Sequence, residues 1–106
     1  MPKYLIKASY TAEGVKGVMK DGGTKRRQAA EAAVKSTGGK LEGFYFAFGE
    51  ADAFVIIDAP DNASVAAASM AIGASGLVSC TTVVLLTPEE IDQAVKKGAT
   101  YTPPGR

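Results

Sequence analysis

The strands expected in this chain carry apolar residues on both of their faces, and this feature constrains the fold more than any other. In residues 40–48, three phenylalanines on one face alternate with Leu41 and Tyr45 on the other. Residues 53–58 and 77–86 repeat the pattern with valine, isoleucine and leucine. An antiparallel sheet that meets water on one side keeps polar residues on that side. The second face is therefore predicted to pack against another copy, in a two-fold symmetric homodimer or a larger homo-oligomer.

The order of the predicted elements defines the fold class. Apolar residues at every second position predict strands, and apolar residues three and four apart predict helices. The expected order is strand 3–10, helices from 11 and from 24, strands 40–48 and 53–58, helix 63–74, strand 77–86 and helix 87–97. This βαββαβ order indicates an α+β, ferredoxin-like fold with an antiparallel four-stranded sheet and an extra C-terminal helix. We expect one domain over residues 1–98 and a tail over 99–106.

Several helix boundaries have local signals. Thr87, followed by proline and then Glu90, has the spacing of a capping box. Thr24 is expected to be the N-cap of the second helix. Gly14 and Gly17 weaken the helix before it, by about 1 kcal/mol each relative to alanine. The C-terminal helix is an alternative cover for the second face of the sheet, but at residues 87–97 it is too short to cover that face alone.

Composition excludes several classes of function. The chain has 106 residues, a formal net charge of +1 and no long apolar run, so we expect neither a nucleic-acid partner nor a membrane partner. It has no histidine, no cysteine pair and no phosphate-binding loop, so triad chemistry, most zinc sites and nucleotide cofactors are not expected. The N-terminus is charged at Lys7, too early for a secretory signal. With Cys80 as its single cysteine, the chain fits a reducing, cytoplasmic compartment.

A run of three basic residues is the first candidate ligand site. Lys25, Arg26 and Arg27 lie in the first turn of the second helix, where positive charge opposes the helix dipole. Together with the helix N–H groups they could receive a phosphate or carboxylate. The alternative is a solvated face, or pairing with Asp21, Glu31 or acidic residues of a partner.

Four strand and turn residues complete the candidates. Three of them are polar-tipped residues within strands: Lys7, Tyr10 and Tyr45. We expect them either to line a ligand pocket or to have only a packing role. Asp52 follows the hairpin. One predicted role is a base with a raised pKa, and the alternative is a turn residue that hydrogen-bonds the backbone. No catalytic residue and no metal ligand is predicted. Cys80 is interpreted as a small buried hydrophobic residue.

Six short motifs together resemble the GYD-domain family of the dimeric α+β barrel superfamily, over residues 2–97. They are Pro2–Ile6, Gly23–Arg27, Gly38–Leu41, Phe46–Gly49, Pro60–Asn62 and Leu86–Glu90. Gly49 and Asp52 match the Gly-Tyr-Asp motif that names the family, whereas Ala51 stands at the tyrosine position. The resemblance implies ferredoxin-like subunits that pair sheet to sheet as a dimeric α+β barrel. The resemblance implies no reaction, because the family has no established activity, and transferring chemistry from related barrel enzymes would be analogy at the level of the fold only.

Two functions remain open at this point. The first is a non-enzymatic oligomeric module that binds a small anionic or organic ligand, or a partner protein. The second is a cofactor-independent enzyme, similar to a monooxygenase or isomerase, acting on a small organic substrate between sheet and helices. The absence of histidine and of paired carboxylates favours the first.

Overall fold

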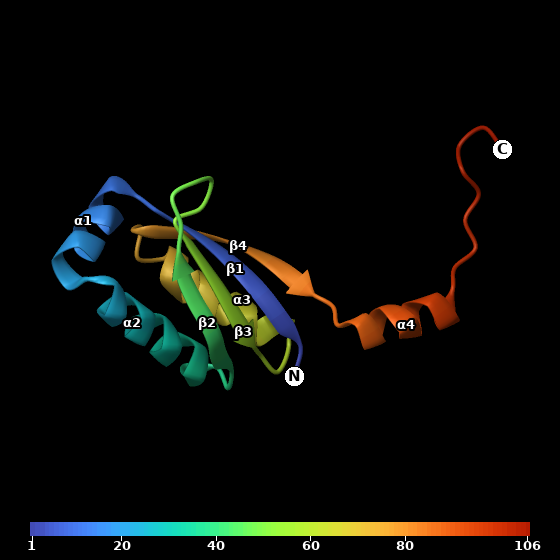
Figure 1. Ribbon diagram of the computed structural model, residues 1–106, viewed down its shortest axis with the longest axis horizontal. Helices are drawn as coiled ribbons and strands as arrows, with labels where there is room; N and C mark the ends of the chain where they lie inside the picture. The colour runs from blue at the N-terminus through green and yellow to red at the C-terminus, as the bar shows by residue number, and fades with distance from the viewer.

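The computed structural model describes residues 1–106 and has the expected α+β architecture (Figure 1). Its elements are β1 (Lys3–Tyr10), α1 (Ala12–Asp21), α2 (Gly23–Ser36), β2 (Lys40–Phe46), β3 (Ala53–Asp58), α3 (Asn62–Gly73), β4 (Val78–Leu85) and α4 (Pro88–Lys97). The four strands form one antiparallel sheet in the order β2-β3-β1-β4. This topology confirms the ferredoxin-like fold.

The hydrophobic core lies between one face of the sheet and helices α2 and α3. Tyr4, Ile6 and Ile57, on the two central strands, are at most 5% exposed. Val34 of α2 and Val65 of α3 pack in the same cluster. Along β1 buried residues alternate with partly exposed ones, as the sequence predicted. The helices therefore cover one face of the sheet and leave the other face open.

A bulge in β2 changes which residues face the core. The register shifts between Leu41 and Gly43, so Leu41 pairs with Ile57 and Phe44 pairs with Val55. Both therefore lie on the helix side of the sheet, and both pack against the core. The prediction that Leu41 lies opposite the phenylalanines was wrong, because a bulge inserts one residue and breaks the alternation. The strand also ends at Phe46, before residue 48.

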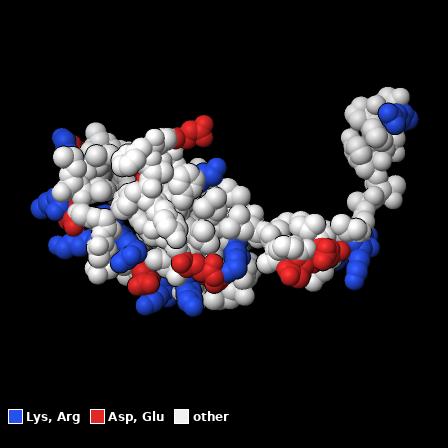
Figure 2. Space-filling view, viewed as in Figure 1, with Lys and Arg blue, Asp and Glu red and all other residues white.

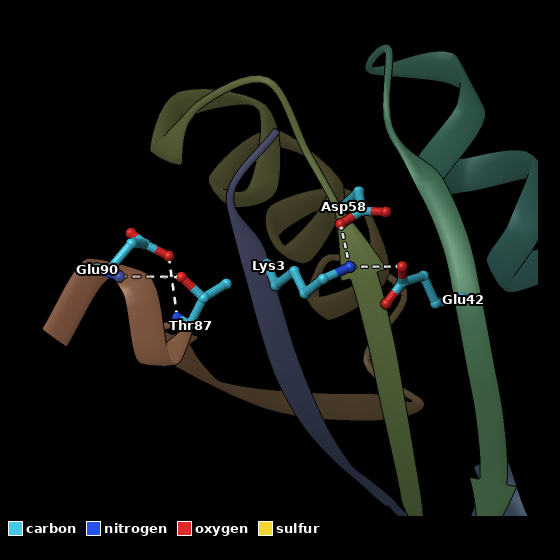
Figure 3. Close-up of polar contacts among 5 residues, drawn as sticks. All are labelled: Lys3, Glu42, Asp58, Thr87 and Glu90. Carbon is cyan, nitrogen blue, oxygen red and sulfur yellow. Dashed lines mark hydrogen bonds and ion pairs between the residues drawn. The ribbon is translucent and has the colours of Figure 1, made fainter. Parts of the chain in front are cut away.

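The start of α2 also differs from the prediction. Thr24 is not its N-cap: α2 begins at Gly23, and Gly22 occupies the cap position without a side-chain hydrogen bond. Gly22 has φ of 80°, a conformation that favours glycine and lets α1 end and α2 begin within one residue. The capping box is confirmed, with Thr87 and Glu90 bonding each other's backbone N–H groups at the start of α4 (Figure 3).

The C-terminal part of the chain extends away from the sheet (Figure 1). No residue of α4 is buried, and α4 does not fold under the open face of the sheet. The molecule measures 57 × 33 × 22 Å as a result. None of the helices combines the length and the apolar character needed to cross a membrane.

Candidate functional site

The sheet face that the helices leave open has an apolar patch between polar ends, with Lys3 and Asp58 at one end and Ser9 and Ser79 at the other. Leu5, Phe54 and Ile56 lie on it, each partly exposed, and Val83 of the edge strand pairs with Leu5. One row across this face contains Lys7 of β1, Phe54 of β3 and Tyr45 of β2, which are successive partners in the strand register. Figure 2 shows charged side chains gathered mainly along the rim of the body and on α4.

An ion triad holds the rim of the sheet where β1 begins. The Lys3 ammonium donates to Asp58 Oδ1 on β3 at 2.9 Å and reaches across that strand to donate to Glu42 on β2 (Figure 3). Hydrogen bonds to Glu42 and to Asp58 raise the pKa of Lys3. The hydrogen bond from Lys3 lowers the pKa of Asp58. The triad joins strands β1, β2 and β3 by charge-assisted hydrogen bonds.

On the opposite side, a partly enclosed cavity of about 90 Å³ lies between the sheet and helices α2 and α3. Alanine residues create it: Ala8 on β1, Ala30 on α2 and Ala68 on α3 line the space. A close-packed core fills such space with larger side chains. Arg26 is the only charged residue among those lining the cavity.

Arg26 and Tyr10 stand at the mouth of this cavity. Both also line an outer hollow of about 340 Å³, which α1 borders with Gly17 and Asp21. The position of Arg26 follows from helix periodicity, because Arg26, Ala30 and Val34 are four residues apart and share one face of α2. Arg26 Nη1 lies 3.5 Å from Asp21 Oδ2, longer than an ordinary hydrogen bond.

The titratable groups of the cavity are held in their protonated forms. Burial raises the pKa of Tyr10, although the charge of Arg26 partly opposes this shift. Burial also raises the pKa of the Cys80 thiol. A phenol, a thiol and a guanidinium therefore meet any molecule in this cavity as proton donors at neutral pH.

Asp52 lies next to this site and has a structural role. Its carboxylate Oδ2 accepts a hydrogen bond from the Tyr10 backbone N–H at 2.8 Å. Its backbone N–H donates to the Ala8 carbonyl and its own carbonyl accepts from Ala47, both at 2.8 Å. These bonds extend the pairing of β1 with the hairpin, and so fix the end of the strand that carries Tyr10.

Comparison with known proteins agrees with this architecture. The family model for the GYD domain matches residues 4–95. The chain belongs to the GYD-domain family. No curated protein and no solved structure matched it. In this GYD domain Ala51 is buried beside Asp52 in the hairpin.

The GYD fold divides the predicted site residues into three groups. Tyr10 and Arg26 meet at the cavity, with Asp52 beside them. Lys7 and Tyr45 lie on the open face of the sheet, away from the cavity.

The third group contains Lys25 and Arg27, which are exposed on α2 and do not line the cavity. The alternative of pairing with Asp21 holds for Arg26. The sequence analysis missed the lining residues Ala8 and Ala68. Both are alanines at positions that face the core. This signal can be recognised only after it is known which face of each strand and helix points toward the core.

Proposed function

We propose that this GYD-domain protein is a non-enzymatic module that binds a small ligand and assembles sheet to sheet with further copies of itself. The observation that carries the binding role is the cavity, which is apolar, has four alanines among its lining residues and has Arg26 as its single charged lining residue. Small-molecule sites in proteins have this composition, with an apolar interior and a few placed polar groups.

The chemistry of the cavity favours binding over catalysis. General-base catalysis needs a group that accepts a proton near neutral pH. The raised pKa values of Tyr10 and Cys80 keep both groups protonated there, and the Asp52 carboxylate is engaged with the Tyr10 backbone. None of the residues lining the cavity carries a carboxylate, so the cavity offers a ligand hydrogen-bond donors without a general base, and we do not carry the enzymatic alternative forward.

The open face of the sheet supports assembly with a second copy. Leu5, Phe54 and Ile56 form a continuous apolar surface that no helix of the same chain covers. Two such faces related by a two-fold axis bury each other, which removes both from water. The paired sheets would form the dimeric α+β barrel that the family resemblance implies.

Substitutions on this face test the assembly. Phe54→Glu replaces an apolar side chain of this face by a carboxylate opposite Lys7. A buried ion pair is less favourable than apolar residues of similar volume by about 1–4 kcal/mol, so the variant should be monomeric where the parent is not. Lys7→Met removes a charge from the same row and should tighten the assembly. Ala32→Glu, on the exposed side of α2, is the matched control.

Sedimentation velocity at several concentrations measures the outcome, and native mass spectrometry of protein purified from its source reports co-purifying ligand. A parent chain that stays monomeric at all concentrations contradicts the sheet-to-sheet assembly. Equal behaviour of Phe54→Glu and Ala32→Glu also contradicts it.

A cytoplasmic location belongs to the same proposal. The single thiol of Cys80 is half-buried and has no partner cysteine. Such a chain needs no oxidising compartment. Mass-spectrometric detection of Cys80 in an intermolecular disulfide, in protein taken directly from its source, would contradict it.

A further inference from the structure

We propose that the ligand is a short apolar carboxylate, with its hydrocarbon chain in the helix-side cavity and its carboxylate on Arg26 at the mouth. This inference rests on the proposed binding function, because it takes the cavity to be the ligand site. It adds the chemical class of the ligand and the residue that selects that class.

The size and lining of the cavity define the apolar part of the ligand. An apolar cavity of about 150 Å³ in a protein core holds a benzene molecule. The cavity here, at about 90 Å³, is smaller and takes a chain of a few carbon atoms. Side chains from Ile6, Val55, Ala68 and Ile72 surround that space, and none of them offers a polar group.

Arg26 defines the polar part. It lines both the inner cavity and the outer hollow, so a molecule whose chain fills the cavity presents its other end to the guanidinium. Five N–H donors in a planar fork match the two oxygens of a carboxylate. The 3.5 Å contact with Asp21 is longer than a hydrogen bond and involves Nη1 alone, which leaves donors for a ligand.

The surrounding charges select an anion over other head groups. A cationic head group would meet Arg26, the only charge lining the inner cavity, and Asp21, the carboxylate of the outer hollow, already lies 3.5 Å from that guanidinium. A neutral head group would leave the guanidinium without an ionic partner in the ligand. Tyr10, at the same mouth, adds a hydroxyl that donates to a carboxylate oxygen.

The experiment compares three probes with equal chain length: pentanoate, pentanamide and pentylammonium. Binding to the full chain is followed by chemical-shift changes of the cavity methyl groups and by the thermal midpoint, because a ligand that binds the folded state raises it. Pentanoate should bind about tenfold or more tightly than pentanamide, since hydrogen bonds to charged groups are the stronger ones. Extending propanoate to pentanoate should gain about fourfold per methylene until the cavity is full.

Variants of α2 separate the two levels of the proposal. Arg26→Gln should remove the preference for pentanoate over pentanamide, and Arg26→Lys should keep part of it, because lysine retains the charge without the fork. Arg27→Gln makes the same charge change at an exposed position and should leave it intact. Ala30→Leu, or the smaller Ala30→Val, fills the cavity and should abolish binding of both probes.

The outcomes are distinguishable. If pentanamide binds as tightly as pentanoate, or if Arg26→Gln and Arg27→Gln behave alike, the carboxylate class is wrong while the cavity remains a binding site. If no probe binds, or if binding survives in a folded Ala30→Leu or Ala30→Val variant, the proposed binding function itself is wrong.

Discussion

At the scale of single residues, two glycines of α1 both lower its helix propensity, but only one of them is required by packing. A Cβ atom on Gly14 would lie 2.2 Å from the Leu77 carbonyl oxygen, whereas a Cβ atom on Gly17 would meet nothing within 4 Å. The Thr11 backbone N–H donates to the same Leu77 carbonyl at 2.9 Å. Gly14 therefore permits the close approach of α1 to the start of β4, and Gly17 has no such role.

We expect opposite effects of alanine at these two positions. Gly14→Ala forces the Thr11–Leu77 contact apart and should lower the free energy of unfolding by about 1–3 kcal/mol. Gly17→Ala improves helix propensity in open space and should raise it by up to about 1 kcal/mol. Urea unfolding followed by circular dichroism measures both. Two variants that change stability in the same direction would contradict this account of Gly14.

The Lys3–Asp58–Glu42 triad makes a prediction about acid stability. The pKa of Asp58 is lowered in the folded state, chiefly by its hydrogen bond with Lys3. Its stabilising contribution is therefore complete above the unfolded pKa near 3.8 and is lost as the pH falls through the lower folded value. In Asp58→Asn the thermal midpoint should fall less steeply with decreasing pH below about pH 4 than it does in the parent chain. Melting curves from pH 2 to pH 6 test this, and an unchanged acid limb would rule out a role for Asp58.

At the scale of elements, α4 differs from the other helices because no packing supports it. Ile91 and Val95, one turn apart, are 47% and 75% exposed. An isolated helix of ten residues is marginal in water. Its capping box therefore carries an unusual share of its stability: Glu90 N–H donates to Thr87 Oγ1 at 3.1 Å, and Thr87 N–H donates to Glu90 Oε1 at 3.0 Å.

Removal of that cap should affect the helix and not the body. Thr87→Ala costs about 1 kcal/mol of local helix stability and should shift the Cα resonances of residues 88–97 toward random coil. The thermal midpoint of the sheet should stay unchanged. Thr11→Ala is the matched control, because Thr11 caps α1 at Gly14 and also bonds Leu77, so it should lower the midpoint. Equal lowering by both variants would show that α4 is packed in solution.

Local sequence accounts for some features of these helices and strands and not for others. The capping box and the strand alternation of β1 were predictable, because each depends on residues that are close in the sequence. The start of α2 was only partly predictable. Thr24 has the chemistry of an N-cap, but Gly22 has the backbone conformation that joins α1 to α2. The bulge at Leu41 was not predictable, because pairing with β3 sets that register.

At the scale of the whole molecule, the single chain is more extended than its length requires. A compact chain of this length has a radius of gyration of about 13 Å, whereas this one has 16.8 Å. Only 12 of its 106 residues are buried, all of them within the body. A sheet covered on one side and an uncovered C-terminal helix account for both values. This surplus of apolar surface is the physical basis of the proposed assembly.

The apolar character of both sheet faces, which constrained the fold from the start, is a property of the sequence alone. Period-two alternation and helical stripes are local, so they determined the strands and the helices. Tertiary structure alone decided which residues meet. It turned Arg26 toward the cavity and Lys25 and Arg27 toward solvent, because α2 docks on the sheet by its Ala30–Val34 face. It also created the cavity, since alanines on three separate elements enclose space only when those elements pack together.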